Sequence, residues 1–249
     1  MVQEKEKAGF PVIPSDRGDE TLQPGLELKQ ILAGRALFRD MVIDVVPDIY
    51  ASVTRKAMEC LERERFITKG DYFLYLHNRI VLMVPEGNPA HILSVADLGR
   101  QEVRISQPNP EYEDIAHHII DMYRDAGGQD LVHRIMEKKR AEGTTILTVV
   151  HHRETPLRIT RGTVDVGPVW ATEVIHARQS NLPVDVVEPG EDLDQRDRID
   201  YYICRLRNGA HPENAEKFLD FIKSARAQGA YKAHGFMPHF GTAEGGESG

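Results

Sequence analysis

Residues 144–178 read TTILTVVHHRETPLRITRGTVDVGPVWATEVIHAR, and the fold is most readily predicted from this stretch. Thr144–Val150 and Thr163–Val169 are apolar, β-branched runs of strand length. Between them, Arg153–Arg161 has helical spacing and is followed by a glycine that stops a helix. A second helix opens at Thr172. The stretch therefore predicts one βαβα unit with two strand-to-helix corners.

The two corners, His151–Thr155 and Pro168–Glu173, are the predicted place of function. In open α/β sheets, ligands bind at the carboxyl ends of strands, where helix N-termini present free N–H groups. Both corners lie in one unit, so we expect them to face one crevice.

The rest of the chain alternates in the same way and predicts an α/β fold with largely parallel sheets. Further predicted strands are Asp40–Val46, Asp48–Ser52, Tyr72–Leu76, Arg79–Val84, Glu102–Ser106, Pro183–Glu188 and Ile199–Leu206. Further predicted helices are Leu26–Leu32, Thr54–Glu64, Leu93–Leu98, Tyr112–Asp125, Gln129–Ala141, one starting at His211-Pro212, and Tyr231–His234.

Composition limits the classes of function. Hydrophobic content of 41% and charged content of 28% are ordinary for a soluble protein, and 249 residues suit one large domain or two lobes. The formal net charge of −8, without a basic stripe, argues against nucleic acid and anionic membrane partners. No apolar run approaches the roughly 20 residues of a membrane span, which predicts no membrane insertion. The start, MVQEKEKAGF, lacks the apolar core of a signal peptide, which counts against export of the chain as written.

Two cysteines, Cys60 and Cys204, predict either two buried or half-buried thiols or, if they lie close in space, a disulfide. The chain has no CxxC, HExxH, P-loop or GxSxG motif, and no GxGxxG in a suitable context. No nucleophile and base stand at a recognisable spacing. We therefore predict neither an enzyme nor a cofactor.

Several segments in order resemble one family, the type II solute-binding proteins of bacterial ABC importers, in the molybdate-binding-like branch. The resemblance covers residues 19–238, and no single motif in it is specific. Beyond the middle HHRETPLRI corner, the segments are VPDIYASVTRKAMECL, NRIVLMVPEGNP, SVADLGRQEVRIS, TVDVGPVWATEVI and HPENAEKFLDFIKSARAQGAYKAHGFMP.

This resemblance implies a two-lobed α/β fold, each lobe a mostly parallel sheet flanked by helices, with ligand in the cleft between the lobes. Lobe one would comprise residues 1–84 plus 203–249, and lobe two residues 85–202. Binding would occur by hinge closure, without chemistry. The resemblance further implies a periplasmic or extracellular location and a membrane permease of an ABC importer as partner.

The start of the chain departs from the family pattern, because the family's first strand and helix precede the segment aligned to residues 10–22. Only the end of that helix, Val2–Lys7, has a counterpart. Either the chain is truncated, or its start is assigned too late, or lobe one is built differently. We expect a monomer, or a dimer if a truncated lobe one leaves strand edges unpaired.

Candidate ligand-binding residues in lobe two lie at the strand-to-helix corners. Trp170 either lines the cleft or is a core aromatic. Thr172 either donates to an anion or only caps its helix. Arg153 either grips an oxyanion with two parallel bonds or forms a surface salt bridge. His152 and Thr155 share the Arg153 corner.

The QPNPEY segment forms another corner, with Asn109 and Tyr112 as candidates, or else a turn and helix cap. On the lobe-one side, the resemblance adds Thr21, Gln23, Tyr50 and Asn78.

The leading hypothesis is a solute-binding protein that captures a small anionic ligand, such as an oxyanion of the molybdate, tungstate or sulfate type. A second is a divalent-metal-binding protein of the same fold that uses His152 and Glu154. Adjacent histidines, as at His151-His152 and His117-His118, cannot both chelate one ion, so no metal ligands are assigned. A third hypothesis is an enzyme or a regulatory ligand-sensing domain.

Overall fold

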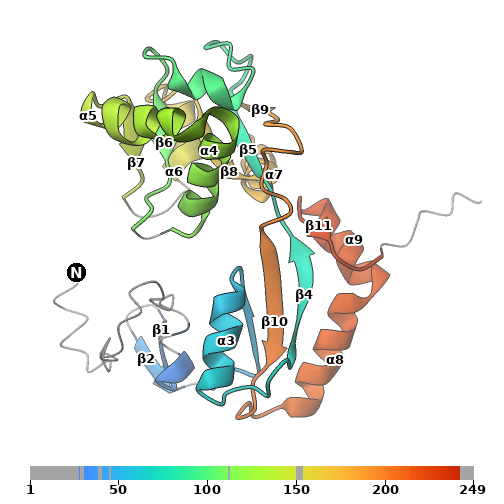
Figure 1. Ribbon diagram of the computed structural model, residues 1–249. Helices are drawn as coiled ribbons and strands as arrows, with labels where there is room; N and C mark the ends of the chain where they lie inside the picture. Colours follow the sequence, from blue (N-terminus) through green and yellow to red (C-terminus); the bar gives the residue numbers. More distant parts are fainter. Residues whose placement is uncertain are drawn as a thin grey trace, which may run out of the picture. The chain divides into compact units, whose positions relative to one another are not determined.

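The computed structural model describes residues 28, 31–38, 41–44, 46–111, 113–149 and 154–241 (Figure 1). The chain forms two compact units. Unit 1 comprises residues 1–75 and 200–224, and unit 2 comprises residues 76–199 and 225–249. The two lobes expected from sequence have different bounds from these units, namely residues 1–84 with 203–249 and residues 85–202. They remain a prediction.

Unit 1 is built on the strands β3 (Ile49–Ser52), β10 (Asp200–Arg205) and the first part of β4 (Tyr72–His77), with β10 between β4 and β3. Helices α3 (Arg55–Arg63) and α8 (Pro212–Lys223) flank these strands (Figure 1). Strands β1 (Arg35–Phe38) and β2 (Met41–Asp44) form a separate antiparallel pair in unit 1.

Helix α3 begins where the sequence predicts it, because the Thr54 hydroxyl accepts the Ala57 N–H at 3.3 Å. Its apolar face buries Met58 and Leu61 completely, in a core shared with Ile67 and Leu206. Tertiary burial of this face, more than helix propensity, holds the helix in place.

Both cysteines are free and buried, as the first of the two sequence alternatives predicts. Burial raises the pKa of the Cys204 thiol to about 12 and also raises that of Cys60. Both side chains therefore behave as small apolar core groups in unit 1.

Unit 2 contains most of the predicted βα corners. Its strands are β5 (Ile80–Pro85), β6 (Ile105–Gln107), β7 (Thr145–Leu147), β8 (Gly167–Trp170), β9 (Val184–Val187) and β11 (Met237–Pro238). Its helices are η1 (Val95–Gly99), α4 (Ile115–His133), η2 (Arg134–Lys138), α5 (Lys139–Ala141), α6 (Glu154–Thr160), α7 (Ala171–Gln179) and α9 (Ala225–Ala233).

Strand directions agree only in part with the predicted parallel sheets. Strands β6 and β7 are parallel, and a parallel bridge joins Ile105 to Val166, just before β8. Strand β5 lies between β8 and β9 and runs against both, so these two strands share one direction. In the described part of unit 1, β1 with β2 and β3 with β10 are antiparallel. The expectation of a mostly parallel sheet is therefore wrong for these pairs. Only two residues separate β1 from β2, too few for the crossover that parallel neighbours need.

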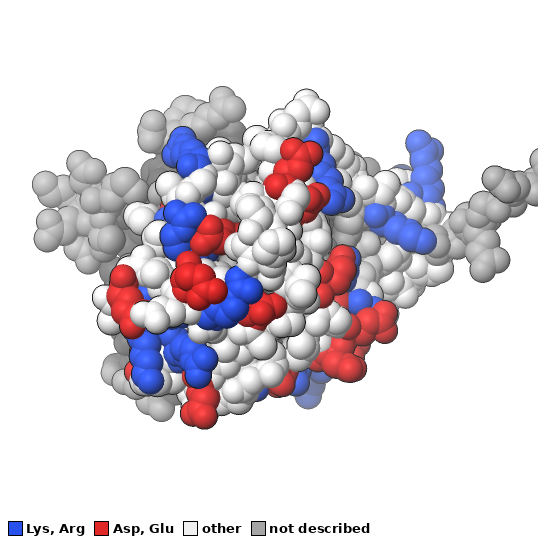
Figure 2. All heavy atoms as spheres, turned by 90° about the horizontal axis from the view of Figure 1, so that it is seen from above, with Lys and Arg blue, Asp and Glu red and all other residues white. Residues whose placement is uncertain are grey.

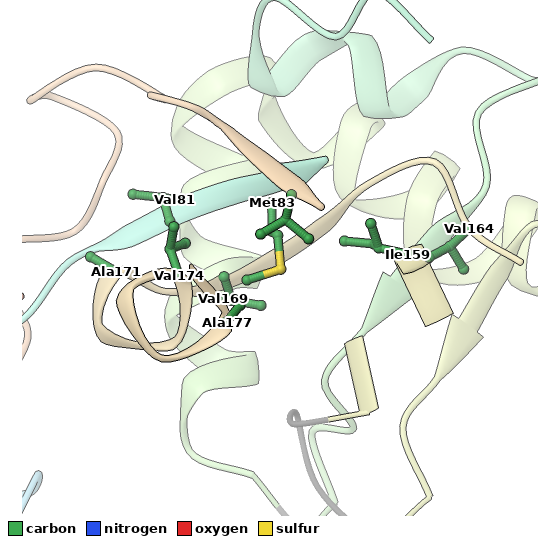
Figure 3. Packing of buried hydrophobic residues seen from close by; sticks show 9 residues of the cluster. Val81, Met83, Ile159, Val164, Val169, Ala171, Val174 and Ala177 are labelled. Atoms are coloured by element: carbon green, nitrogen blue, oxygen red, sulfur yellow. The ribbon is translucent and has the colours of Figure 1, made fainter. Parts of the chain in front are cut away.

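The core of unit 2 lies where β5 and β8 pack against α7 (Figure 3). It contains Val81 and Met83 from β5, Val169 from β8, and Val174 from α7. Strand β5 is buried along nearly its whole length, because it has a neighbouring strand on each side and helices against it.

Most predicted elements are present, with bounds shifted by a few residues. The strand expected over Thr163–Val169 begins at Gly167, and α9 is longer than the predicted Tyr231–His234. Between the helices predicted over Tyr112–Asp125 and Gln129–Ala141, the structure has a kink inside α4, where Gly127 and Gly128 leave helical geometry. Strand β1 was not predicted.

A salt bridge between Arg104 and Asp165 fixes the start of β6 to the segment before β8. The guanidinium donates from Nη2 to Asp165 Oδ1 at 2.6 Å and from Nε to Oδ2 at 3.1 Å, and the Arg104 backbone N–H donates at 2.8 Å. Burial acts to raise the pKa of Asp165, but these bonds from Arg104 dominate and lower it.

Asp165→Asn is expected to lower the free energy of unfolding of unit 2 by about 1–3 kcal/mol at neutral pH. Because the folded-state pKa is depressed, this contribution is complete above the unfolded pKa of about 4 and fades as the pH falls below it. Trp170, the only tryptophan, lies in unit 2. Urea titrations followed by its fluorescence should show the gap between wild type and variant closing in acid, and a gap that is constant with pH would contradict this account.

Candidate functional site

The loops that follow β6 and β7 are hydrogen-bonded to each other. The backbone N–H of Asn109 donates to the Thr148 hydroxyl at 3.0 Å, and the Thr148 N–H donates to the Gln107 carbonyl at 2.9 Å. The Thr148 hydroxyl in turn donates to the Glu113 carboxylate. Asn109 is thereby fixed at the carboxyl end of β6, where sequence predicted a corner.

Thr155 stands in the first turn of α6 and joins that helix to β6. It is fully buried, and its hydroxyl lies 2.8 Å from the Ser106 hydroxyl. The Arg158 guanidinium also donates to Ser106, at 3.3 Å. A Cβ placed on Gly167 of β8 would come within 2.3 Å of the Thr155 methyl group. Thr155 therefore packs between β6 and β8. This position suits a residue that orients the corner at the start of α6.

Trp170 ends β8 and is the N-cap residue of α7, as predicted for this corner. It is 8% exposed, and its ring centroid lies 6.2 Å from that of His118 on α4. Burial lowers the pKa of His118, so the neutral imidazole is favoured beside the indole. Helix α4 comes after the Asn109 loop in the chain. Its residue His118 contacts Trp170, so this helix connects the Asn109 corner to the Trp170 corner.

Thr172, in the first turn of α7, lies beside Asn78. The Asn78 amide donates to the Thr172 hydroxyl at 3.5 Å, at the long limit of a hydrogen bond. Asn78 is fully buried, its N–H donates to the Ile199 carbonyl, and its Oδ1 accepts the Arg79 N–H at 2.9 Å. Sequence reasoning put Asn78 on the lobe-one side, whereas the structure has it in unit 2.

Tyr50 belongs to unit 1, in the middle of β3 opposite Cys204. Its side chain is half-buried and packs against the unit 1 core. Its carbonyl oxygen accepts a long hydrogen bond from the Cys204 thiol, at 3.6 Å.

The other predicted site residues lie outside the described part of the chain: Thr21, Gln23, Tyr112, His152 and Arg153. Their roles remain predictions. Within the described residues, no group of three or more His, Cys, Asp or Glu side chains could hold a metal ion.

Sequence reasoning missed Ser106, Thr148 and His118. Ser106 ends a predicted strand and Thr148 lies two residues before the end of another, and their hydroxyls could have suggested a role there. His118 gave no such signal, because its proximity to Trp170 depends on how α4 packs.

Two acidic side chains near these corners, Glu113 and Glu154, accept hydrogen bonds within unit 2. Glu113 accepts from Thr148, and Glu154 accepts from Arg158 at 2.7 Å and from the Val149 N–H at 2.9 Å. Elsewhere, acidic and basic side chains intermingle on the face that Figure 2 shows. A local set of hydroxyl and N–H donors can therefore act in spite of the net charge of −8.

The class of protein follows from comparison with known families. Residues 23–237 match the family described as bacterial extracellular solute-binding protein, and the chain belongs to this family. The family is one of binding proteins rather than enzymes, which confirms that prediction.

Among relatives, the chain is 23% identical over 189 residues to YvgL of Bacillus subtilis strain 168, provisionally named an ABC transporter substrate-binding lipoprotein. The match covers 76% of this chain and 66% of the relative, so the chain spans less than two thirds of that protein.

Two solved structures show the same fold, that of type II periplasmic binding proteins, as predicted. The periplasmic molybdate-binding protein of Azotobacter vinelandii aligns with a TM-score of 0.63 and 20% identity, over 86% of this chain and 83% of that one. The sulfate-binding protein SubI of Mycobacterium tuberculosis H37Rv aligns with a TM-score of 0.65 and 19% identity, over 77% and 69%.

Among the helices that the structure describes, none has both the length and the apolar content needed to cross a bilayer.

Proposed function

We propose that this chain is the substrate-binding component of an ABC-type importer. It captures a small anionic solute, an oxyanion of the molybdate, tungstate or sulfate type, and delivers it to a membrane permease. It works in the periplasm or outside the cell. Membership of the extracellular solute-binding family supports the role, and the fold shared with molybdate- and sulfate-binding proteins supports the class of solute.

The observation that supports the proposal is the set of polar residues at strand ends in unit 2, several of which are hydrogen-bonded to each other. The loops after β6 and β7 are tied together through Asn109 and Thr148, and Thr155 locks α6 onto β6. The first turn of α7 follows β8, and its N-cap residue, Trp170, makes no side-chain cap hydrogen bond. Corners of this kind favour anions, because fixed N–H and hydroxyl dipoles replace the water shell of the ion without reorganising.

The proposed mechanism is hinge closure. A solute stabilises a closed state only by contacts that it makes better there than in the open state. Thr172 and Asn109 are proposed to donate to the anion from unit 2. Thr155, fully buried, is proposed to orient its corner rather than to touch the solute.

Isothermal titration of molybdate, tungstate, sulfate and phosphate tests the proposal. We expect saturable binding of at least one of these anions. Asn109→Ala and Thr172→Val are each expected to weaken it by roughly tenfold, the effect of losing one hydrogen bond to a charged group. Gln101→Ala, which removes an exposed amide before β6, should leave affinity unchanged. If none of the four anions gives a binding heat, the proposal that the solute is an oxyanion is wrong.

A further inference from the structure

Two histidines far apart in sequence meet in unit 2. His77 ends β4, and His239 follows β11 directly. His77 Nε2 and His239 Nδ1 lie 3.0 Å apart. The ring centroids are 5.2 Å apart and the ring planes are inclined by 55°, so the nitrogens approach edge to edge and the rings do not stack.

The backbone holds both residues in place. Strands β4 and β11 are antiparallel, with Met237 opposite His77 (Figure 1). His239 is two residues beyond Met237, so it shares a face of the sheet with His77 and lies within reach as a diagonal neighbour. The fully buried Gln228 accepts the N–H groups of His239 and Phe240, at 3.0 and 3.2 Å. The segment after β11 is therefore anchored from the interior.

We propose that His77 and His239 form a two-histidine binding site for a divalent copper or nickel ion. At a metal–nitrogen distance of about 2.0–2.1 Å, two nitrogens 3.0 Å apart subtend about 95° at the metal. That angle matches adjacent ligands of a square-planar or octahedral ion, whereas a tetrahedral ion needs about 109°. Imidazole is a favoured ligand of copper and nickel, and copper binds most tightly of the common divalent ions.

Metal binding to this pair needs only a small adjustment. In the metal-free pair, one ring donates its N–H to the facing nitrogen of the other. When a metal binds through both facing nitrogens, that proton moves to the second nitrogen of its own ring, so no net proton is released from neutral imidazoles. A modest rotation of each ring turns both lone pairs toward one point, and histidine χ2 is soft enough to allow it. His239 is exposed and His77 half-exposed, so water can supply the remaining ligands.

Electron paramagnetic resonance of the full-length protein with one equivalent of Cu²⁺ at neutral pH tests the proposal. We expect a signal with coupling to two imidazole nitrogens. His77→Asn and His239→Asn are each expected to abolish the two-nitrogen pattern and to weaken copper affinity by roughly tenfold or more, because each removes the chelate. Circular dichroism verifies that both variants fold. The matched control is His234→Asn, which removes an exposed histidine close to β11 and should change neither spectrum nor affinity.

An unchanged copper spectrum in both variants, or no saturable two-nitrogen signal in the wild type, overturns the proposal. Loss of the signal in His152→Ala would also overturn it, because the copper site would then be at that histidine. The outcome is independent of the oxyanion titrations: His239→Asn should bind anions as the wild type does.

Discussion

Lys139→Met is expected to lower the free energy of unfolding of unit 2 by about 2–4 kcal/mol. Lys139 is 2% exposed, and its ammonium group donates to the carbonyls of Arg100 and Val103 at 2.6 Å and of Gln101 at 3.3 Å. The ammonium group thereby provides hydrogen bonds to backbone carbonyls between η1 and β6, a segment that is not part of a strand. Methionine fills a similar volume but cannot donate, so the carbonyl of the buried Val103 loses its bond to the ammonium group, whereas that of Arg100 keeps the Val103 N–H.

The loss is smaller than the sum of three hydrogen bonds, because removing a buried charge also removes its desolvation penalty. That penalty is visible in the pKa of Lys139, which burial lowers. Lys138→Met is the matched control, since Lys138 precedes it in the chain and is exposed. Urea titrations followed by Trp170 fluorescence should separate the two variants. Equal urea midpoints for Lys139→Met and Lys138→Met would contradict the prediction and would mean that the carbonyls form hydrogen bonds with other donors.

Gly167→Ala is expected to destabilise unit 2 by about 3 kcal/mol through overpacking. The added Cβ would lie 2.3 Å from the Thr155 methyl carbon and 3.1 Å from the Ser106 carbonyl oxygen. Because Thr155 is fully buried and its hydroxyl is held by Ser106, its side chain cannot turn away freely. The same change should disturb the corner at which α6 begins.

A double-mutant cycle isolates the contact. Thr155→Ser removes the clashing methyl group and keeps the hydroxyl that meets Ser106. Combined with Gly167→Ala, it should recover more than half of the lost stability, a coupling in the range seen for side chains in direct contact. Additive effects of the two substitutions would mean that the added methyl group is absorbed by movement of the backbone and not by Thr155.

Sequence patterns predicted those parts of the fold that depend on neighbouring residues. The Thr54 cap, the glycine break in α4 and the Trp170 corner were all visible, because caps, breaks and strand ends are local events. The family was also recognisable, since motifs keep their order along the chain. Asn109 and Thr172 were predicted at strand-to-helix corners for the same reason, and the structure has them there.

Sequence alone determined the class of protein: an α/β chain of the solute-binding family, with its polar residues at strand ends. Only the tertiary structure decided which distant groups meet. The burial of Lys139 against three carbonyls, the contact of Thr155 with Ser106 and the pairing of His77 with His239 all join segments separated by tens of residues or more. The physical reason is that periodicity specifies which face of an element is buried, whereas the partner across that face depends on how the whole unit packs.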